Sequence, residues 1–229
     1  MKFKNENIQI SCDGGAATGK STGAKMIAKK YKLKFLSSGL LYRYASLLIL
    51  KYKPKNTINF LKKKFNKLDY KKIEKINMHS PEISEHTAII AKISKIRIIL
   101  KRFQVNFSKK NKNCCIEGRD ISTKILPNSD VKFFFKCSLD TAALRRYKEL
   151  KRKNSKIKLK DVKKALRIRN ILDTKRKNSP LLQHRDSVEI DTGKLDKSAM
   201  LDKMSTYVEK VLKKKYGNWT RAKKHKPAT

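Results

Sequence analysis

Gly14-Gly15-Ala16-Ala17-Thr18-Gly19-Lys20-Ser21 is the stretch of sequence that decides the fold of this chain. It fits the pattern G-x-x-x-x-G-K-[ST], in which glycines let successive backbone N–H groups point inward at a phosphate group. A short apolar run, 8–12, precedes the stretch, and a helix-like segment, 20–31, follows it. The N-terminal end of that helix adds positive potential to the same site. The sequence therefore predicts a strand, a phosphate-binding loop and a helix, in that order.

The loop predicts a nucleoside triphosphate as its ligand. Lys20 can reach the β- and γ-phosphates, and the Ser21 hydroxyl can ligate Mg²⁺. A glycine-rich turn that binds nothing is the alternative interpretation. We expect the triphosphate to contact the loop and the first helical turn, at Gly14, Gly15, Ala16, Ala17, Thr18, Gly19, Lys20, Ser21 and Thr22.

The length and composition of the chain are typical of a single α/β core. Its 229 residues are enough for one hydrophobic core with small inserts. No run of about 18 or more apolar residues occurs, so the sequence predicts no membrane span. The first residues lack an apolar signal segment, which favours a cytoplasmic protein. The four cysteines have no C-x-x-C spacing, so we expect reduced, buried thiols.

The net charge of +40 attracts nucleic acids, acidic membranes and nucleotides alike. The excess is spread along almost the whole chain and consists of 47 lysines against 12 arginines. A diffuse lysine excess is more typical of compositional drift than of a dedicated binding face, so we expect nucleic acid to bind only incidentally. Arginine offers phosphate a planar, bidentate fork, so the few arginines point to specific sites better than the lysines do.

Short apolar segments alternate with amphipathic segments along the chain. The alternation predicts an α/β fold with a parallel sheet covered by helices on both faces. Together with the phosphate loop, it predicts a P-loop NTPase fold with a central five-stranded parallel sheet flanked by helices. Ligands of such sheets gather at the carboxyl ends of the strands. Strand-like runs lie at 8–12, 32–36, 114–117, 131–137 and 187–191. Helix-like patterns lie at 20–31, 39–51, 82–108, 139–152, 159–172 and 196–215.

Two segments interrupt this alternation. Residues 52–81 are polar and lysine-rich and look like an insert over the cleft, while residues 153–180 are strongly basic and look like a mobile helical flap. Residues 216–229 form a basic tail that we expect to be disordered. The expected core consists of residues 1–51, 82–152 and 181–215.

Three further motifs follow the phosphate loop in order. They are Ser37-Ser38-Gly39-Leu40-Leu41-Tyr42-Arg43, Glu117-Gly118-Arg119-Asp120-Ile121-Ser122-Thr123, and Arg169-x-x-x-Asp173-x-x-Arg176-x-x-x-Pro180-Leu181. From Ile8 to Val211, this combination resembles bacterial cytidylate kinase, of the nucleoside monophosphate kinase group. The resemblance implies that a monomer transfers the γ-phosphoryl group of ATP to CMP or dCMP, with Mg²⁺, in pyrimidine nucleotide metabolism. It also implies that 52–81 is a shortened monophosphate-binding insert and 153–180 a helical lid.

The resemblance assigns roles to the residues that match the family's motifs. Arg43 and Arg119 would hold the CMP phosphate, while Arg97 would contact the base and Asp173 the ribose. Asp120 would accept a hydrogen bond from the cytosine amino group, which uracil lacks. The implied CMP-binding residues are Ser38, Tyr42, Arg43, Arg97, Arg119, Asp120, Arg169, Asp173 and Arg176, and Arg146 is implied as a contact to ATP. The implied catalytic residues are Lys20, Arg43, Arg119, Arg169 and Arg176, with Ser21 as the metal ligand.

Read alone, several of these residues allow a purely structural interpretation. Tyr42 could pack on the core, Asp120 could form an ion pair that fixes its loop, and Arg97 could lie on the polar face of a helix. The segment around Arg169 and Arg176 could be a basic, solvated helix.

Three features depart from the family's pattern. Ser37 stands where the family has aspartate, and Ala88, with Thr87 adjacent, stands where it has a serine near the cytosine. The insert at 52–81 is shorter and lacks a glycine-punctuated strand pattern. The missing serine weakens the case for strict cytosine selectivity, so a P-loop kinase for UMP or AMP stays open. The charge keeps a basic nucleic-acid-binding ATPase open as well.

Overall fold

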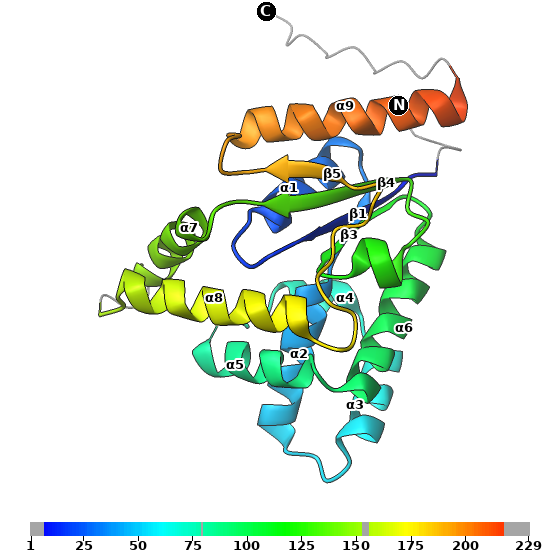
Figure 1. Ribbon diagram of the computed structural model, residues 1–229. Helices are drawn as coiled ribbons and strands as arrows, with labels where there is room; N and C mark the ends of the chain where they lie inside the picture. The colour runs from blue at the N-terminus through cyan, green and yellow to red at the C-terminus, as the bar shows by residue number, and fades with distance from the viewer. Residues whose placement is uncertain (1–6, 79, 153–155, 218–229) are drawn as a thin grey trace, which may run out of the picture.

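The structure of the protein is a computed structural model that describes residues 7–78, 80–152 and 156–217 (Figure 1). The tail beyond Gly217 lies outside the described residues, as does segment 153–155 of the expected flap. Tyr216, which we expected in the disordered tail, ends the last helix instead.

Within the described residues, five parallel strands form one sheet, as predicted. Their order is β2-β3-β1-β4-β5, so the strand that leads into the phosphate loop lies in the middle. Ile10 pairs with Cys115 on one side and with Val131 on the other. The strands are β1 (Gln9–Gly14), β2 (Lys34–Ser37), β3 (Cys114–Gly118), β4 (Val131–Lys136) and β5 (Val188–Asp191).

Helices cover both faces of the sheet, because its central strands are apolar on both sides. On one face, Ile27 of α1 and Met204 of α9 pack with Phe135. On the other face, Leu41 of α2 and Leu100 of α6 belong to a second buried cluster (Figure 1). The helices are α1 (Lys20–Lys30), α2 (Ser38–Tyr52), α3 (Thr57–Asn66), α4 (Tyr70–Glu74), α5 (Pro81–Ile90), α6 (Ser94–Lys110), the π-helix η1 (Ile121–Ile125), α7 (Leu139–Lys151), α8 (Leu159–Lys175) and α9 (Lys197–Tyr216).

The prediction of one helix over 82–108 was wrong, because the chain forms α5 and α6 there with a break between them. Ile93, which precedes α6, has an extended backbone with φ −82° and ψ 109°. No glycine or proline marks this break in the sequence. The Arg97 guanidinium donates to the carbonyl of Ala91 over 3.2 Å, so a tertiary contact satisfies a carbonyl group at the end of α5.

The polar segment 52–78 is built from the two short helices α3 and α4. Asn56 and Asp69 cap their N-termini with side-chain hydrogen bonds. Leu61 and Phe65 turn inward and join the core on the α2 and α6 side of the sheet. Phe65 meets Phe103 of α6 edge to face, with ring centroids 6.1 Å apart. Apolar contacts therefore hold this lysine-rich segment against α6.

Helices α7 and α8 pack on each other beside the carboxyl ends of the strands (Figure 1). Val162 and Leu166 of α8 are buried with Ala142 and Ala143 of α7. The same cluster contains Ala16 of the phosphate loop. The expected flap is therefore helical over Leu159–Lys175, and the apolar face of this helix lies against the loop.

Candidate active site

A cleft with a volume of about 800 Å³ opens where the first three strands of the sequence end. It collects residues that the sequence predicted for both nucleotides, although Gly14 and Gly15 are not among its described lining residues. The predicted residues that line it are Ala16, Ala17, Thr18, Gly19, Lys20, Ser21, Thr22, Ser38, Tyr42, Arg43, Arg97, Arg119, Asp120, Arg146, Arg169, Asp173 and Arg176.

The backbone of the phosphate loop requires glycine at positions 14 and 19. Gly14 has a φ of 156°, and a Cβ atom there would lie 2.5 Å from the carbonyl oxygen of Phe135. Gly19 caps α1 in the left-handed region, with a φ of 78°. The Thr192 hydroxyl donates to the carbonyl of Thr18 over 2.9 Å, so the turn after β5 supports the loop. These constraints place the first turn of α1 at the cleft.

A buried carboxylate, Glu117 at the end of β3, connects the phosphate loop to the neighbouring strand. The Ser37 hydroxyl donates to its Oε1 atom over 2.5 Å, and Lys20 Nζ lies 3.5 Å from its Oε2 atom. The Ser21 hydroxyl also hydrogen-bonds this carboxylate. Burial by itself would raise the pKa of Glu117, but Lys20 and the hydroxyl groups hold that pKa below its usual range. Glu117 is therefore an anion at neutral pH.

The buried ammonium group of Lys20 has a lowered pKa. Burial lowers the pKa of its ammonium group to about 8, and the positive charge of Arg119 acts in the same direction. Glu117 opposes this effect but does not cancel it. An anionic ligand near Lys20 would therefore stabilise the charged form of its side chain.

Ser37, which stands where the family has aspartate, has a clear structural role. Its hydroxyl accepts a hydrogen bond from the N–H of Leu40 and thereby caps α2. Its own N–H donates to the Tyr70 hydroxyl over 2.7 Å. Ser37 therefore joins α2 and α4 and, through its hydroxyl, Glu117.

Ser21 and Glu117 place oxygen atoms side by side at the phosphate loop. Oxygen is the ligand type that Mg²⁺ prefers, and Mg²⁺ in kinase sites keeps several ligands from phosphates and water. The residues present therefore fit a Mg²⁺ ion that would take one hydroxyl from the protein.

Three arginines converge on the opposite part of the cleft. Arg119 Nε donates to Asp173 Oδ2 over 2.8 Å, and Arg43 Nη1 donates to the Ser84 hydroxyl over 2.9 Å. Burial lowers the pKa of Arg169 to about 10, and the nearby charge of Arg119 adds to the effect. Like charges that repel one another in a buried site favour an anionic ligand.

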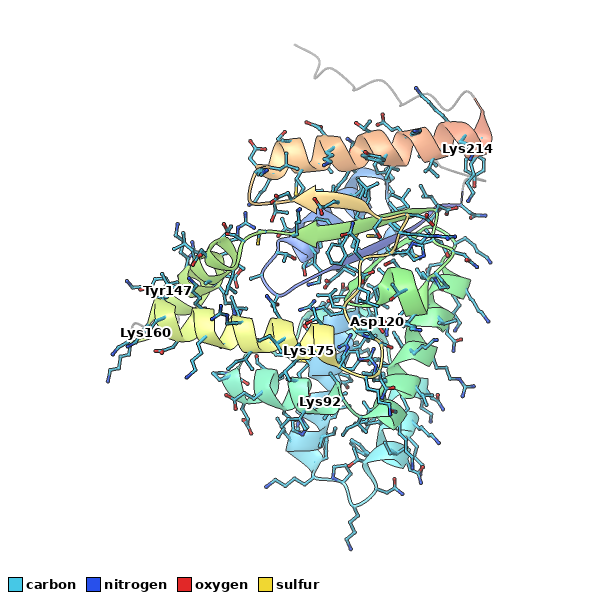
Figure 2. All side chains as sticks on the ribbon, viewed as in Figure 1. Lys92, Asp120, Tyr147, Lys160, Lys175 and Lys214 are labelled. Carbon is cyan, nitrogen blue, oxygen red and sulfur yellow. The ribbon has the colours of Figure 1, made fainter. Side chains whose placement is uncertain are left out.

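A further wall of the cleft is made by Arg97 and Asp120. Arg97 Nη2 donates to Asp120 Oδ2 over 2.6 Å, and the guanidinium lies over the Tyr42 ring, 5.7 Å from its centroid. Figure 2 shows Asp120 near the Lys175 end of α8. Arg176, which follows that helix, places Nη2 3.9 Å from Asp120 Oδ1. This Nη2 atom is buried and has no hydrogen-bond partner among the residues that the structure describes. The wall thus offers both a carboxylate acceptor and guanidinium donors.

The purely structural interpretations of Arg97, Asp120 and Tyr42 have different outcomes in the structure. Arg97 lies on helix α6, but it has only 8% of its surface exposed and lines the cleft, so the interpretation that it merely belongs to the polar face of a helix was wrong. The ion pair considered for Asp120 is present, and the same pair lines the cleft. Tyr42 is buried in the core cluster and also lines the cleft.

Sequence reasoning assigned no role to Glu117, which lines the cleft, or to Asp13, which is not among the described residues that line it. Asp13 lies at the end of β1 and is fully buried. It accepts hydrogen bonds from the N–H groups of Ile121 and Ser122, over 2.8 Å and 2.7 Å. Burial raises the pKa of Asp13 to about 6, although these hydrogen bonds oppose the rise. An acidic residue directly before Gly14 in a buried strand was the signal that the sequence offered.

The two adjacent arginines of α7 have different hydrogen-bond partners in the structure. Arg145 donates to the Thr192 hydroxyl over 2.8 Å and to the Thr192 carbonyl over 2.6 Å, next to the phosphate loop. Arg146, which the sequence favoured, donates to Glu149 over 3.0 Å. Both arginines line the cleft. The local sequence does not distinguish the two adjacent arginines, so it could not indicate that Arg145 is the one that lies next to the phosphate loop.

Two expectations from composition can be compared with the structure. Cys12, Cys114 and Cys115 are buried and Cys137 is half-buried, and all four thiols are free. The burial expected for the cysteines is confirmed for three of the four and holds only in part for Cys137. In the described ranges, no helix combines the length and the apolar character needed to cross a membrane.

Known proteins resemble this chain over most of its length. The family model for cytidylate kinase matches residues 10–210. A cytidylate kinase of Clostridium botulinum is 35% identical over 216 residues, covering 89% of this chain and 99% of that protein. One of Fusobacterium nucleatum is 34% identical over 228 residues, covering 90% and 99%. A crystal structure of an uncharacterized Eubacterium ventriosum protein shares the fold, with a TM-score of 0.52, 15% identity and coverage of 90% and 99%. The chain belongs to the cytidylate kinase family.

Proposed function

We propose that the protein transfers the γ-phosphoryl group of ATP to CMP or dCMP, giving ADP and CDP or dCDP. One observation carries the proposal: a single cleft holds a phosphate loop, a separate arginine cluster and the Arg97–Asp120 pair. The loop suits a triphosphate, the cluster suits a second phosphate group, and the pair suits a base. Membership of the cytidylate kinase family supports the same reaction.

The donor side would be formed by the loop, Lys20 and Arg146. Lys20 would hold the β- and γ-phosphates, and the loop N–H groups would surround them. Mg²⁺, ligated by Ser21, supplies positive charge that neutralises the phosphates when it is bound. Glu117 lies 3.5 Å from the Lys20 ammonium group and holds it at the cleft. When ATP binds, this ammonium group would move from the Glu117 carboxylate to the phosphates.

The acceptor side would be formed by arginines. Phosphoryl transfer needs little covalent chemistry from the protein, so catalysis consists of positioning and charge neutralisation. Arg43 and Arg119 would hold the acceptor phosphate, while Arg169 and Arg176 would reach the transferring group from the lid. The acceptor oxygen is already ionised, so Asp120 has no need to act as a general base.

The base and the ribose would be bound between these two sides. An ionised carboxylate only accepts hydrogen bonds and a guanidinium only donates them. Cytosine offers an amino donor at N4 and acceptors at N3 and O2, so Asp120 would face N4 while Arg97 faces one of the ring acceptors. With uracil, Asp120 would face a carbonyl oxygen instead. Asp173, held by Arg119 over 2.8 Å, would bind the ribose hydroxyls.

Three parts of the chain would then have separate functions in catalysis. Residues 52–81 would form the monophosphate-binding insert and residues 153–180 the lid, and the remaining core would carry the phosphate loop. Closure of the lid would exclude water, which otherwise hydrolyses ATP. The proposal treats the enzyme as a cytoplasmic monomer.

A coupled assay of ADP release with CMP, dCMP, UMP and AMP tests the proposal. We expect CMP or dCMP to raise ADP release far above the background with ATP alone. We expect kcat/KM for UMP and AMP to be at least about 100-fold lower, because each leaves a buried polar group of the site unpaired. A preference for UMP or AMP would contradict the proposal, and so would an ATPase that responds to RNA and to none of the monophosphates.

A further inference from the structure

A hydroxyl group on α5 lies at the base side of the cleft and has no part in the function proposed above. Thr87 has only 7% of its surface exposed, and it lines the cleft together with Tyr42, Arg97 and Asp120. The adjacent Ala88 has no hydrogen-bonding side chain. Within α5, all of which is described, Thr87 is thus the hydroxyl-bearing residue that lines the cleft.

Thr87 lies one helical turn from the point where α5 holds Arg97. Ala91 follows Thr87 by four residues, so both lie on the same face of the helix, about 6 Å apart along its axis. Both line the cleft, and the carbonyl of Ala91 accepts from Arg97 Nη1 over 3.2 Å. Arg97 in turn holds Asp120 over 2.6 Å. The Thr87 hydroxyl therefore shares a wall with the pair that the proposed function assigns to the base.

A second hydroxyl fixes the position of the first. Thr87 Oγ1 and Ser46 Oγ lie 3.0 Å apart and share a hydrogen bond. Ser46 belongs to α2, is fully buried and does not line the cleft. Two hydroxyl groups carry two protons, and the bond between them uses one. When Ser46 donates, the Thr87 proton is free to be donated into the cleft.

We propose that Thr87, positioned by Ser46, binds the substrate's cytosine by donating its hydroxyl proton to a ring acceptor, N3 or O2. This inference rests on the proposed function. When Asp120 takes the amino group, cytosine presents two acceptors to the rest of the wall. Arg97 supplies one donor for them, and Thr87 supplies the second. A base bound without this contact would leave an acceptor unpaired in a buried site.

The variant Thr87→Val keeps the shape of the side chain and removes the hydroxyl. We expect KM and the calorimetric Kd for CMP to rise about tenfold, the loss of one hydrogen bond. We expect kcat to stay within about twofold, because the base contact is equal in the ground state and the transition state. Thr87→Ser should return KM for CMP to within about threefold of the wild-type value. An unchanged KM for CMP in a folded Thr87→Val protein would overturn the inference.

A matched control and a second variant keep the test decisive. Ser108→Ala removes a buried hydroxyl of α6 that donates to Val105 and does not line the cleft, so KM for CMP should not change. If Thr87→Val does not fold, Ser46→Ala carries the test: it should raise KM for CMP about threefold at constant kcat, and no rise would overturn the inference. A wild-type protein that fails to phosphorylate CMP would overturn the proposed function instead.

Discussion

Asp13 holds Ser122 through two hydrogen bonds to one oxygen, from its N–H group over 2.7 Å and from its hydroxyl over 2.6 Å. The other oxygen accepts from the N–H of Ile121 over 2.8 Å. Asp13 directly precedes Gly14 of the phosphate loop, and Ser122 lies two residues after Asp120. One buried carboxylate thus joins the loop proposed for ATP to the loop proposed for CMP.

Replacing Asp13 by asparagine should therefore affect the acceptor side more than the donor side. The amide has one acceptor oxygen and one donor group, so an N–H group of η1 loses its partner. We expect the free energy of unfolding to fall by about 2 kcal/mol. We expect KM for CMP to rise about tenfold and KM for ATP less than threefold, measured by steady-state kinetics beside urea denaturation. Equal changes in the two KM values would contradict this role.

Ser37→Asp should destabilise the protein, although it restores the residue typical of the family. The new carboxylate would stand beside the buried Glu117, which Ser37 now contacts over 2.5 Å. Two carboxylates at this distance repel each other, and one must bind a proton or move away. We expect a loss of about 1–2 kcal/mol at pH 8, which shrinks at pH 5, where a shared proton relieves the repulsion. Urea denaturation at both pH values measures it.

The matched comparison for this prediction is Ser37→Ala. It removes the hydroxyl that caps α2 and contacts Glu117, so it should cost about 1 kcal/mol without strong dependence on pH. A Ser37→Asp protein as stable as wild type at pH 8 would contradict the predicted repulsion.

Arg119→Ala should reduce catalysis at saturating CMP and ATP. A guanidinium that holds the acceptor phosphate contributes several kcal/mol to the transition state, so we expect kcat to fall at least about 100-fold. The exposed Arg102 of α6 gives the control, because Arg102→Ala should leave kcat unchanged. A kcat for Arg119→Ala within about threefold of wild type would refute the assigned role.

Binding of ATP should take up a proton at pH 8 to 9. Burial lowers the pKa of Lys20 to about 8, so part of the free protein lacks this proton in that range. The phosphates of ATP favour the charged ammonium and raise its pKa, so a proton is taken up on binding. The Kd for ATP should then rise with pH above 8, by up to about tenfold per unit. Calorimetry in two buffers of different ionisation enthalpy measures the uptake.

Lys20→Arg is the control for proton uptake, because a guanidinium stays charged throughout this range. Its binding of ATP should show no uptake between pH 8 and 9. Uptake of equal size in this variant would assign the proton to another group.

The sequence by itself determined the elements whose signals are local. The apolar runs and the glycine pattern predicted β1, the phosphate loop and α1, because a strand needs only alternating or continuous apolar residues and the loop needs glycine where a Cβ does not fit. The five strands and most helices followed in the same way. The order of the motifs after successive strands placed them in one cleft, because parallel strands end at the same edge of a sheet.

Only the tertiary structure decided which side chains meet. The predicted long helix breaks where no local residue type marks a break, and Arg97 beside this break reaches the carbonyl of Ala91 and the carboxylate of Asp120. Glu117 contacts Ser37 from 80 residues away, and Asp13 contacts Ser122 from 109 residues away. Contacts between such distant residues depend on the packing of whole elements. Local sequence reports the backbone preference of each segment, and it carries no information on the partner that another segment brings to a buried polar group.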